Sequence, residues 1–210
     1  MEIIDQATKI KLEGLLSHLK APIELILWRS GSELDDQIRQ LCVAAASANS
    51  AVSIAEARKG DGPSGFWIAK KGFEPLIGLQ GLPMGHEFAS FVLAMLHASG
   101  HPPKLSEQEV EAAKNLPEGL MVETFYSQSC HNCPDTIQAI NAICSISGKV
   151  KHVAIDGASN QQLAEERGVF SVPAVHAGGV LAASGRMGAS EILAALSRKG
   201  GASGPKRPLF

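Results

Sequence analysis

The feature that most restricts the fold of this chain is an internal near-repeat. The segment GLQGLPMGHEFASFVLAML lies over LAASGRMGASEILAALSR, so that Gly81 aligns with Gly185 and Glu87 with Glu191. A second pair of segments, IELILWRSGSELDDQI and VETFYSQSCHNCPDTI, matches in its pattern of apolar and polar residues. Repetition of this length predicts two related structural units in tandem.

The second half of the chain is predicted to have the order β-α-β-α-β-β-α. The expected elements are strand 120–126, a helix after the cysteines, strand KHVAI, helix 160–167, a hairpin around Gly178-Gly179 and helix 190–198. The first half nearly repeats this order with strand 23–28, helix 33–47, strands FWIA and LIGL, and a helix from about 85 to 98. A helix near 8–20 precedes them, with an apolar face that includes Ile10, Leu12, Leu15 and Leu16. The segment EARKGDGPSG is the central crossover of the first half, and it is too polar and Gly-rich for a helix.

The segment between the two halves reads as a linker helix. Two prolines, Pro102 and Pro103, break the chain, and Ser106 with Glu109 has the spacing of a capping box. We therefore expect a first unit at 1–100, a linker helix at 101–118, a second unit at 119–199 and a linker or tail at 200–210.

Composition excludes some classes of function. The formal net charge is −2, which gives no electrostatic footprint for nucleic acid. Acidic residues near the start do not suit a signal peptide, and the longest apolar run is too short to span a bilayer. We expect a cytoplasmic protein with no membrane partner, in which four cysteines are reduced, catalytic or metal-bound rather than structural staples.

The pair Cys130 and Cys133 carries the chemical signal. A Cys-x-x-Cys loop between a strand and a helix places the first sulfur at the helix N-terminus, where the backbone N–H groups and the helix dipole favour a thiolate. Such settings lower a cysteine pKa to roughly 3.5–7.5. Cys133, one turn further on, can attack a mixed disulfide at Cys130, while His131 and Asn132 between them should tune the pair.

A proline downstream completes the pattern. Pro173 stands at the start of the unit's third strand, where a cis bond would present the backbone of Val172 to an incoming chain. The loop and this proline together indicate a thioredoxin-like redox site.

Two other interpretations of the cysteines remain open at this point. A zinc site needs two further ligands, and only scattered histidines are available. Purely structural thiols are the other alternative for this pair. Cys42 and Cys144 fall on apolar helix faces and are expected to be buried core residues; a regulatory thiol is the alternative for Cys144.

Glu87, in GHEF at a helix start, allows two interpretations. The first is ordinary compensation of the helix N-terminus by a negative charge. The second is a carboxylate that handles protons and faces the cysteines from the first unit.

The motifs SCHNCPD, HVAIDG, VPAV and GHEFASFVLAML closely resemble the N-terminal region of the flavoprotein subunit of bacterial alkyl hydroperoxide reductase, over about residues 1–199. The resemblance implies an α/β fold of two tandem thioredoxin-like folds packed together, of which only the second keeps a redox disulfide. It implies that Cys130 and Cys133 form that disulfide and that Glu87 matches a carboxylate proposed to assist the thiol chemistry.

The resemblance also implies a function and its partners. The chain would pass electrons from a flavoprotein dithiol to the disulfide of a peroxiredoxin, so that peroxide is detoxified. FAD and NAD(P)H would belong to a reductase domain in cis or in trans, because the dinucleotide fingerprints of the family are missing here. The alternatives are a general, glutaredoxin-like protein disulfide reductase and a non-catalytic, zinc-stabilised binding module.

Overall fold

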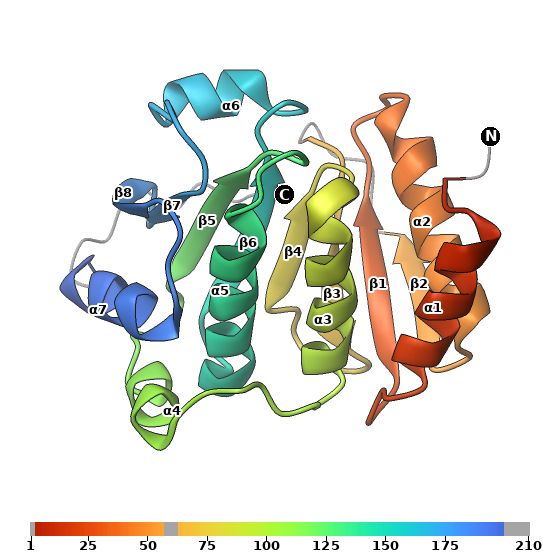
Figure 1. The fold of residues 1–210 in the computed structure, drawn as a ribbon, viewed down its shortest axis with the longest axis horizontal. Coiled ribbons are helices and arrows are strands. Elements are labelled where there is room, and N and C mark those ends of the chain that lie inside the picture. Colours follow the sequence, from red (N-terminus) through yellow and green to blue (C-terminus); the bar gives the residue numbers. More distant parts are fainter. Residues whose placement is uncertain (1–2, 57–62, 200–210) are drawn as a thin grey trace.

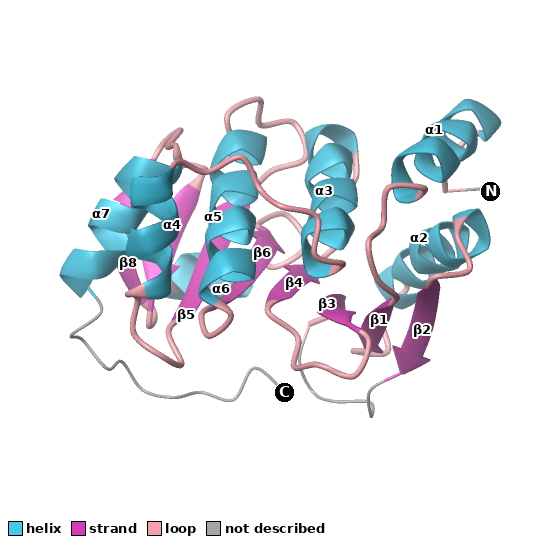
Figure 2. Ribbon diagram, turned by 90° about the horizontal axis from the view of Figure 1, so that it is seen from below, coloured by secondary structure: helices cyan, strands magenta, loops and turns pink. Residues whose placement is uncertain are grey.

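In the part of the chain that the structure describes, eight strands form one mixed sheet, with helices on both faces (Figures 1 and 2). This computed structural model describes residues 3–56 and 63–199. Along the sheet the strands follow the order β2-β1-β3-β4-β6-β5-β7-β8. The first four strands of this order come from the first half of the chain and the last four from the second half.

The elements of the first half and the linker are α1 (Gln6–Leu16), β1 (Ile23–Trp28), α2 (Leu34–Ala48), β2 (Val52–Glu56), β3 (Gly65–Lys70), β4 (Ile77–Gln80), the 3-10 turn η1 (Gly85–Glu87), α3 (Phe88–Ala98) and α4 (Glu107–Lys114). Those of the second half are β5 (Met121–Tyr126), α5 (Cys133–Ser147), β6 (Lys151–Asp156), α6 (Gln161–Glu166), β7 (Ala174–Ala177), β8 (Val180–Ser184) and α7 (Ala189–Lys199). The order β-α-β-α-β-β-α predicted for the second half is confirmed.

The two halves repeat each other in strand pairing. In each, the first strand pairs in parallel with the second and antiparallel with the third, and the third pairs antiparallel with the fourth. Even single hydrogen bonds recur: the N–H of Gly81 donates to the carbonyl of Ser64 at 2.9 Å, and the N–H of Gly185 donates to that of Pro173 at 2.8 Å. Both glycines have positive φ, which favours glycine, so the aligned pair marks the same turn twice. The predicted repeat is therefore structural.

The units join edge to edge. Strand β4 pairs in parallel with β6, from Ile77 opposite His152 to Gln80 opposite Ile155. On one face of the sheet, α3 packs beside α5 over this junction (Figure 1). The main apolar core extends without a break from α1 and α2 to α7. A smaller core that includes Trp28, Trp67 and Phe125 lies on the other face, where α6 contributes Leu163.

The first half departs from the expectations in two places. Strand β2 was not predicted. Its apolar side chains Val52 and Ile54 are two residues apart, the spacing of one face of a strand, with Val52 buried and Ile54 half-buried. Helix α1 ends at Leu16 rather than near residue 20, and Ile10 and Leu15 of its predicted apolar face are 60% and 44% exposed. Residues 57–62 of the crossover expected to lack a helix lie outside the described residues.

The expectations for the capping box and for two of the cysteines are confirmed. Ser106 and Glu109 form the capping box at the start of α4, each side chain accepting the other's backbone N–H. The free cysteines Cys42 and Cys144 are fully buried, and burial raises the pKa of both thiols. No helix within residues 3–56 and 63–199 is long and apolar enough to cross a membrane. The domain boundaries stay a prediction.

Candidate functional site

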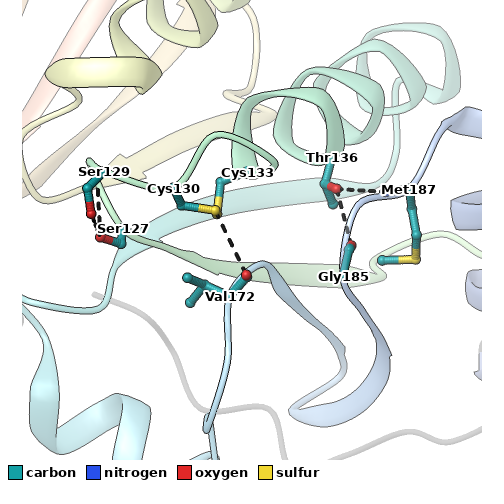
Figure 3. The surroundings of a disulfide bond; sticks show 8 residues. All are labelled: Ser127, Ser129, Cys130, Cys133, Thr136, Val172, Gly185 and Met187. Carbon is teal, nitrogen blue, oxygen red and sulfur yellow. Dashed lines mark hydrogen bonds between the residues drawn. A yellow bond between two sulfur atoms is a disulfide. The ribbon is translucent and has the colours of Figure 1, made fainter.

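The cysteine loop, defined as residues 127–132, connects a buried strand to a long helix. The side chains of β5 from Val122 onward are buried, so the strand fixes where the loop begins. Helix α5 then starts at Cys133, with a proline in its first turn that needs no hydrogen-bond partner for its nitrogen. Cys130 and Cys133 are joined in a disulfide (Figure 3), with their Cα atoms 5.5 Å apart. The bond links the loop to the first turn of the helix.

The two sulfurs differ in exposure. Cys133 is completely buried, whereas Cys130 is only partly buried. A molecule that approaches from solvent therefore meets Cys130 first. The loop residues His131 and Asn132 are both exposed, and Asn132 precedes α5 without a side-chain capping bond.

The cis peptide bond between Val172 and Pro173 lies next to the disulfide. The carbonyl oxygen of Val172 is 3.8 Å from Sγ of Cys130 (Figure 3). Pro173 is buried and Val172 is half-buried. The loop between β8 and α7 is also bound to α5, because the Thr136 hydroxyl accepts the N–H of Met187 at 3.1 Å. The sequence prediction of a cis proline beside the cysteines matches this geometry.

The first unit contributes one side of the site through the turn that precedes α3. The N–H of His86 donates to the carbonyl of Gln128 at 3.2 Å, and the side-chain amide of Gln128 donates back to the carbonyl of Leu82 at 3.1 Å. The ring of His86 packs on the ring of His131, with 4.1 Å between centroids. Turn η1 also packs against α5. The cysteine loop is thus held in place by the first unit.

Glu87 is the last residue of that turn and is fully buried. Neither of its carboxylate oxygens has a hydrogen-bond partner among the described residues. Burial raises the pKa of Glu87 to about 7, while the neighbouring Ser90 hydroxyl acts in the lowering direction. A carboxyl group with this pKa gains or loses a proton near neutral pH, as a proton-handling group must. Compensation of a helix N-terminus needs the charged form, which burial disfavours.

Tyr126 was missed by the sequence reasoning. Its side chain is fully buried, and its hydroxyl has no hydrogen-bond partner in the described part of the chain. Burial raises its pKa, and the negative charges of Asp156 and Glu87 add to that effect. The available signal was that this is the chain's single tyrosine, four residues before Cys130. It adds a second unpartnered polar group to the junction.

The equivalent position in the first unit holds no sulfur. Helix α2 begins at Leu34 where α5 begins at Cys133, which puts Gly31 at the position of Cys130. A carboxylate, that of Asp35, accepts the N–H groups of Ser30 and Gly31 at 3.3 and 2.8 Å. Next to it, the hydroxyl of Ser64 is hydrogen-bonded to the hydroxyls of Ser30 and Ser32. The first unit has no dithiol here.

Among residues 3–56 and 63–199, no group of three or more His, Cys, Asp and Glu side chains is arranged to hold a metal ion. The two cysteines are instead bonded to each other as a disulfide.

Residues 121–197 match the family described as Thioredoxin domain. Over 201 residues the chain is 35% identical to the alkyl hydroperoxide reductase AhpF of Pseudomonas putida, a match that covers 95% of this chain and 38% of that protein. It is 36% identical over 197 residues to the AhpF of Escherichia coli, covering 91% of this chain and 37% of that protein. The chain thus spans less than two-fifths of the curated relatives that it matches.

Solved structures show the same fold. The N-terminal domain of alkyl hydroperoxide reductase AhpF from Enterococcus faecalis superposes with a TM-score of 0.84 at 23% identity, over 92% of this chain and 99% of that one. A protein disulfide oxidoreductase from Aeropyrum pernix gives 0.78 at 18% identity, over 93% of each chain. The predicted fold class, two tandem thioredoxin-like folds with a Cys-x-x-Cys site in the second, is confirmed.

Proposed function

Because this chain is homologous to the N-terminal domain of the alkyl hydroperoxide reductase AhpF, we propose that it is a thiol–disulfide oxidoreductase that passes electrons to the disulfide of a peroxiredoxin. The observation that carries the proposal is the disulfide between a partly exposed Cys130 and a buried Cys133, beside the carbonyl of Val172. This arrangement gives the partner one accessible sulfur and keeps the second for the next step.

The reaction begins from the reduced pair. The Cys130 thiolate attacks one sulfur of the partner's disulfide, so a mixed disulfide forms and the partner's other sulfur leaves as a thiolate. Cys133, as a thiolate, then attacks the sulfur of Cys130, which releases the partner's second thiolate and forms the Cys130–Cys133 bond. Two electrons have passed to the partner, whose thiolates take up two protons, and an upstream flavoprotein dithiol restores the reduced pair.

The surrounding residues have distinct proposed roles. Glu87, whose pKa burial raises to about 7, exchanges the proton that Cys133 must lose before it attacks. His131 and Asn132 set the balance between dithiol and disulfide, because they lie between the two sulfurs in sequence. Val172 offers its backbone to the partner's chain, and Pro173 holds that backbone in place.

The same homology supports a proposal for the partners and cofactors. The electron acceptor is a peroxiredoxin, and the donor is a flavin reductase part joined in cis or acting in trans. In this proposal FAD and NAD(P)H bind to that reductase part. A cytoplasmic location agrees with this chemistry, because a dithiol is maintained there by reducing conditions.

The test uses Cys130→Ser and Cys133→Ser. Reduced protein, freed of small thiols, is mixed with oxidised peroxiredoxin, and the appearance of peroxiredoxin thiols is followed. Cys130→Ser should lose at least roughly 100-fold in rate, since a hydroxyl is no substitute for a thiolate. Cys133→Ser should instead accumulate the mixed disulfide, visible by mass.

Cys144→Ala serves as the control, because that thiol is free and buried about three helical turns beyond Cys133 in α5, and the variant should react at the wild-type rate. Reduction by Cys130→Ser at the wild-type rate would refute the mechanism. Equal turnover of insulin and peroxiredoxin would favour a general disulfide reductase. About one zinc per chain, with no titratable dithiol, would favour a zinc-stabilised module.

A further inference from the structure

Phe170 has its side chain almost entirely in solvent, at 99% exposure. Four other phenylalanines, Phe66, Phe88, Phe91 and Phe125, are buried or partly buried. Phe170 belongs to the proline loop, defined as residues 168–172, which runs from α6 to the cis peptide bond. Single exposed apolar side chains are common on protein surfaces, so the position of Phe170 just before the cis peptide bond matters more than its exposure.

The proline loop is held in place on both sides of Phe170. On its N-terminal side, the guanidinium of Arg167 donates two hydrogen bonds to the carboxylate of Glu123, at 3.0 and 3.1 Å. The N–H of Val169 donates to the carbonyl of Ala164 at 2.9 Å. The side chains of Val169 and Val172 both pack against the smaller apolar core. The neighbours of Phe170 are therefore anchored while Phe170 itself points away from the protein.

The position of Phe170 relative to the reactive sulfur follows from chain geometry. Val172 is two residues further along, and two residues span at most about 7 Å. The carbonyl oxygen of Val172 is 3.8 Å from Sγ of Cys130. Any protein whose disulfide reaches Cys130 must therefore place the chain around that disulfide next to the proline loop.

The character of the proline loop selects apolar contact. Its sequence, GVFSV, carries no charged residue. Aromatic side chains at the centre of an interface tend to dominate binding, and a fixed backbone lowers the entropy lost on association. A residue with this exposure, beside the site of exchange, suits a contact made only while the partner is bound.

We propose that Phe170 is the docking anchor for the peroxiredoxin segment that carries the disulfide, and that it contacts an apolar side chain next to the partner's cysteine. This inference rests on the proposed function and adds to it the residue that recognises the partner. Recognition through Phe170 is apolar, so its contribution to KM should not depend on salt, unlike that of an ion pair.

The experiment compares Phe170→Ser with Phe73→Ser. Phe73 is also exposed, at 64%, but it lies in the turn between β3 and β4 of the first unit. Steady-state reduction of peroxiredoxin is measured at several concentrations, and the reaction of the reduced pair with a small soluble disulfide is measured in parallel. Phe170→Ser should raise KM for peroxiredoxin by roughly tenfold or more, with a much smaller effect on the small disulfide. Phe73→Ser should match the wild type in both reactions.

Phe170→Leu should recover most of the affinity, because it restores an apolar group without an aromatic ring. An unchanged KM for Phe170→Ser, in a series where the wild type reduces peroxiredoxin, overturns this inference and leaves the proposed function standing. A defect confined to reduction by the upstream flavoprotein also overturns it, since the anchor would then serve the electron donor. A wild type that fails to reduce peroxiredoxin removes the proposed function and this inference together.

Discussion

Cys130 and Cys133 are bonded to each other but differ in exposure, and in the proposed reaction this difference makes Cys130 the attacking thiol. Cys130 faces the solvent and the Val172 carbonyl, while Cys133 is closed off within the first turn of α5. Two further side chains, those of Glu87 and Tyr126, are buried and lack hydrogen-bond partners within the described residues. Unsatisfied buried polar groups cost stability, so they tend to be kept where they serve chemistry.

Glu87→Gln is expected to remove a pH dependence from the stability of the protein. Burial raises the pKa of Glu87 from 4.5 to about 7, so between these values the folded state binds more protons than the unfolded state. The free energy of unfolding of the wild type therefore falls as the pH rises through this window. The variant should lack this contribution, which is on the order of 1–3 kcal/mol.

Urea denaturation at pH 4.5 and pH 8 measures the effect as a difference between variant and wild type. Glu191→Gln is the matched control, because Glu191 aligns with Glu87 but is exposed. A Glu87→Gln protein with the same pH dependence as the wild type would show that the carboxyl titrates alike in both states.

At the scale of elements, the site depends on turn η1 docking against the cysteine loop. Gly85 opens this turn at a φ of +60°, and a Cβ there would stand 2.6 Å from the carbonyl oxygen of Gln128. The same segment supplies the hydrogen bonds of His86 and Leu82 to the loop. Close backbone contact between the two units is therefore possible only without a side chain at this position.

Gly85→Ala should destabilise the protein by more than its backbone conformation alone requires. Gly148→Ala is the control, because Gly148 has a similar φ of +67° and open space around it. The control should lose about 1–2 kcal/mol from left-handed strain, and Gly85→Ala should lose at least about 1 kcal/mol more from the clash. Chemical denaturation gives both values. Equal losses would mean that the loop moves aside at no cost.

The sequence predicted those elements whose signals are local. Strand β5, the helix after the cysteines and the cis proline follow from apolar patterns and motif spacing, and these place Cys130, Cys133 and Val172 together. Strand β2 was not predicted because it is short and, of its side chains, only that of Val52 is fully buried. The face of α1 was overestimated because an isolated apolar residue such as Ile10 does not reveal whether anything covers it.

Other parts of the site depend on tertiary contacts that no local pattern contains. Glu87 and Tyr126 come from different halves of the chain, and both side chains are fully buried in the folded structure. Phe170 stands in the largely apolar run GVFSVPAV, yet its side chain is exposed while its neighbours Val169 and Val172 pack inward. Only the path of the loop distinguishes them.

On the scale of the whole molecule, the two units behave as one sheet. The β4–β6 pairing and the packing of α3 on α5 bury surface that either unit alone would expose to water. The apolar core crosses the junction, with Phe91 and Met95 of α3 in the same cluster as Ile137 and Ile140 of α5. Unfolding one unit would expose the other's half of this core, so the units should unfold together.

The two buried free thiols test this coupling, because Cys42 lies in α2 of the first unit and Cys144 in α5 of the second. With the Cys130–Cys133 bond kept oxidised, an alkylating reagent reacts only with these two. Each thiol reacts only after the structure around it opens, so its labelling rate reports the free energy of that opening. We expect both thiols to give the same opening free energy and the same dependence on urea, since opening is global. Peptide mass analysis after timed labelling separates the two sites. A first unit that opened alone would label Cys42 at lower urea than Cys144, and that unit would then be a detachable partner of the redox fold rather than part of its structure.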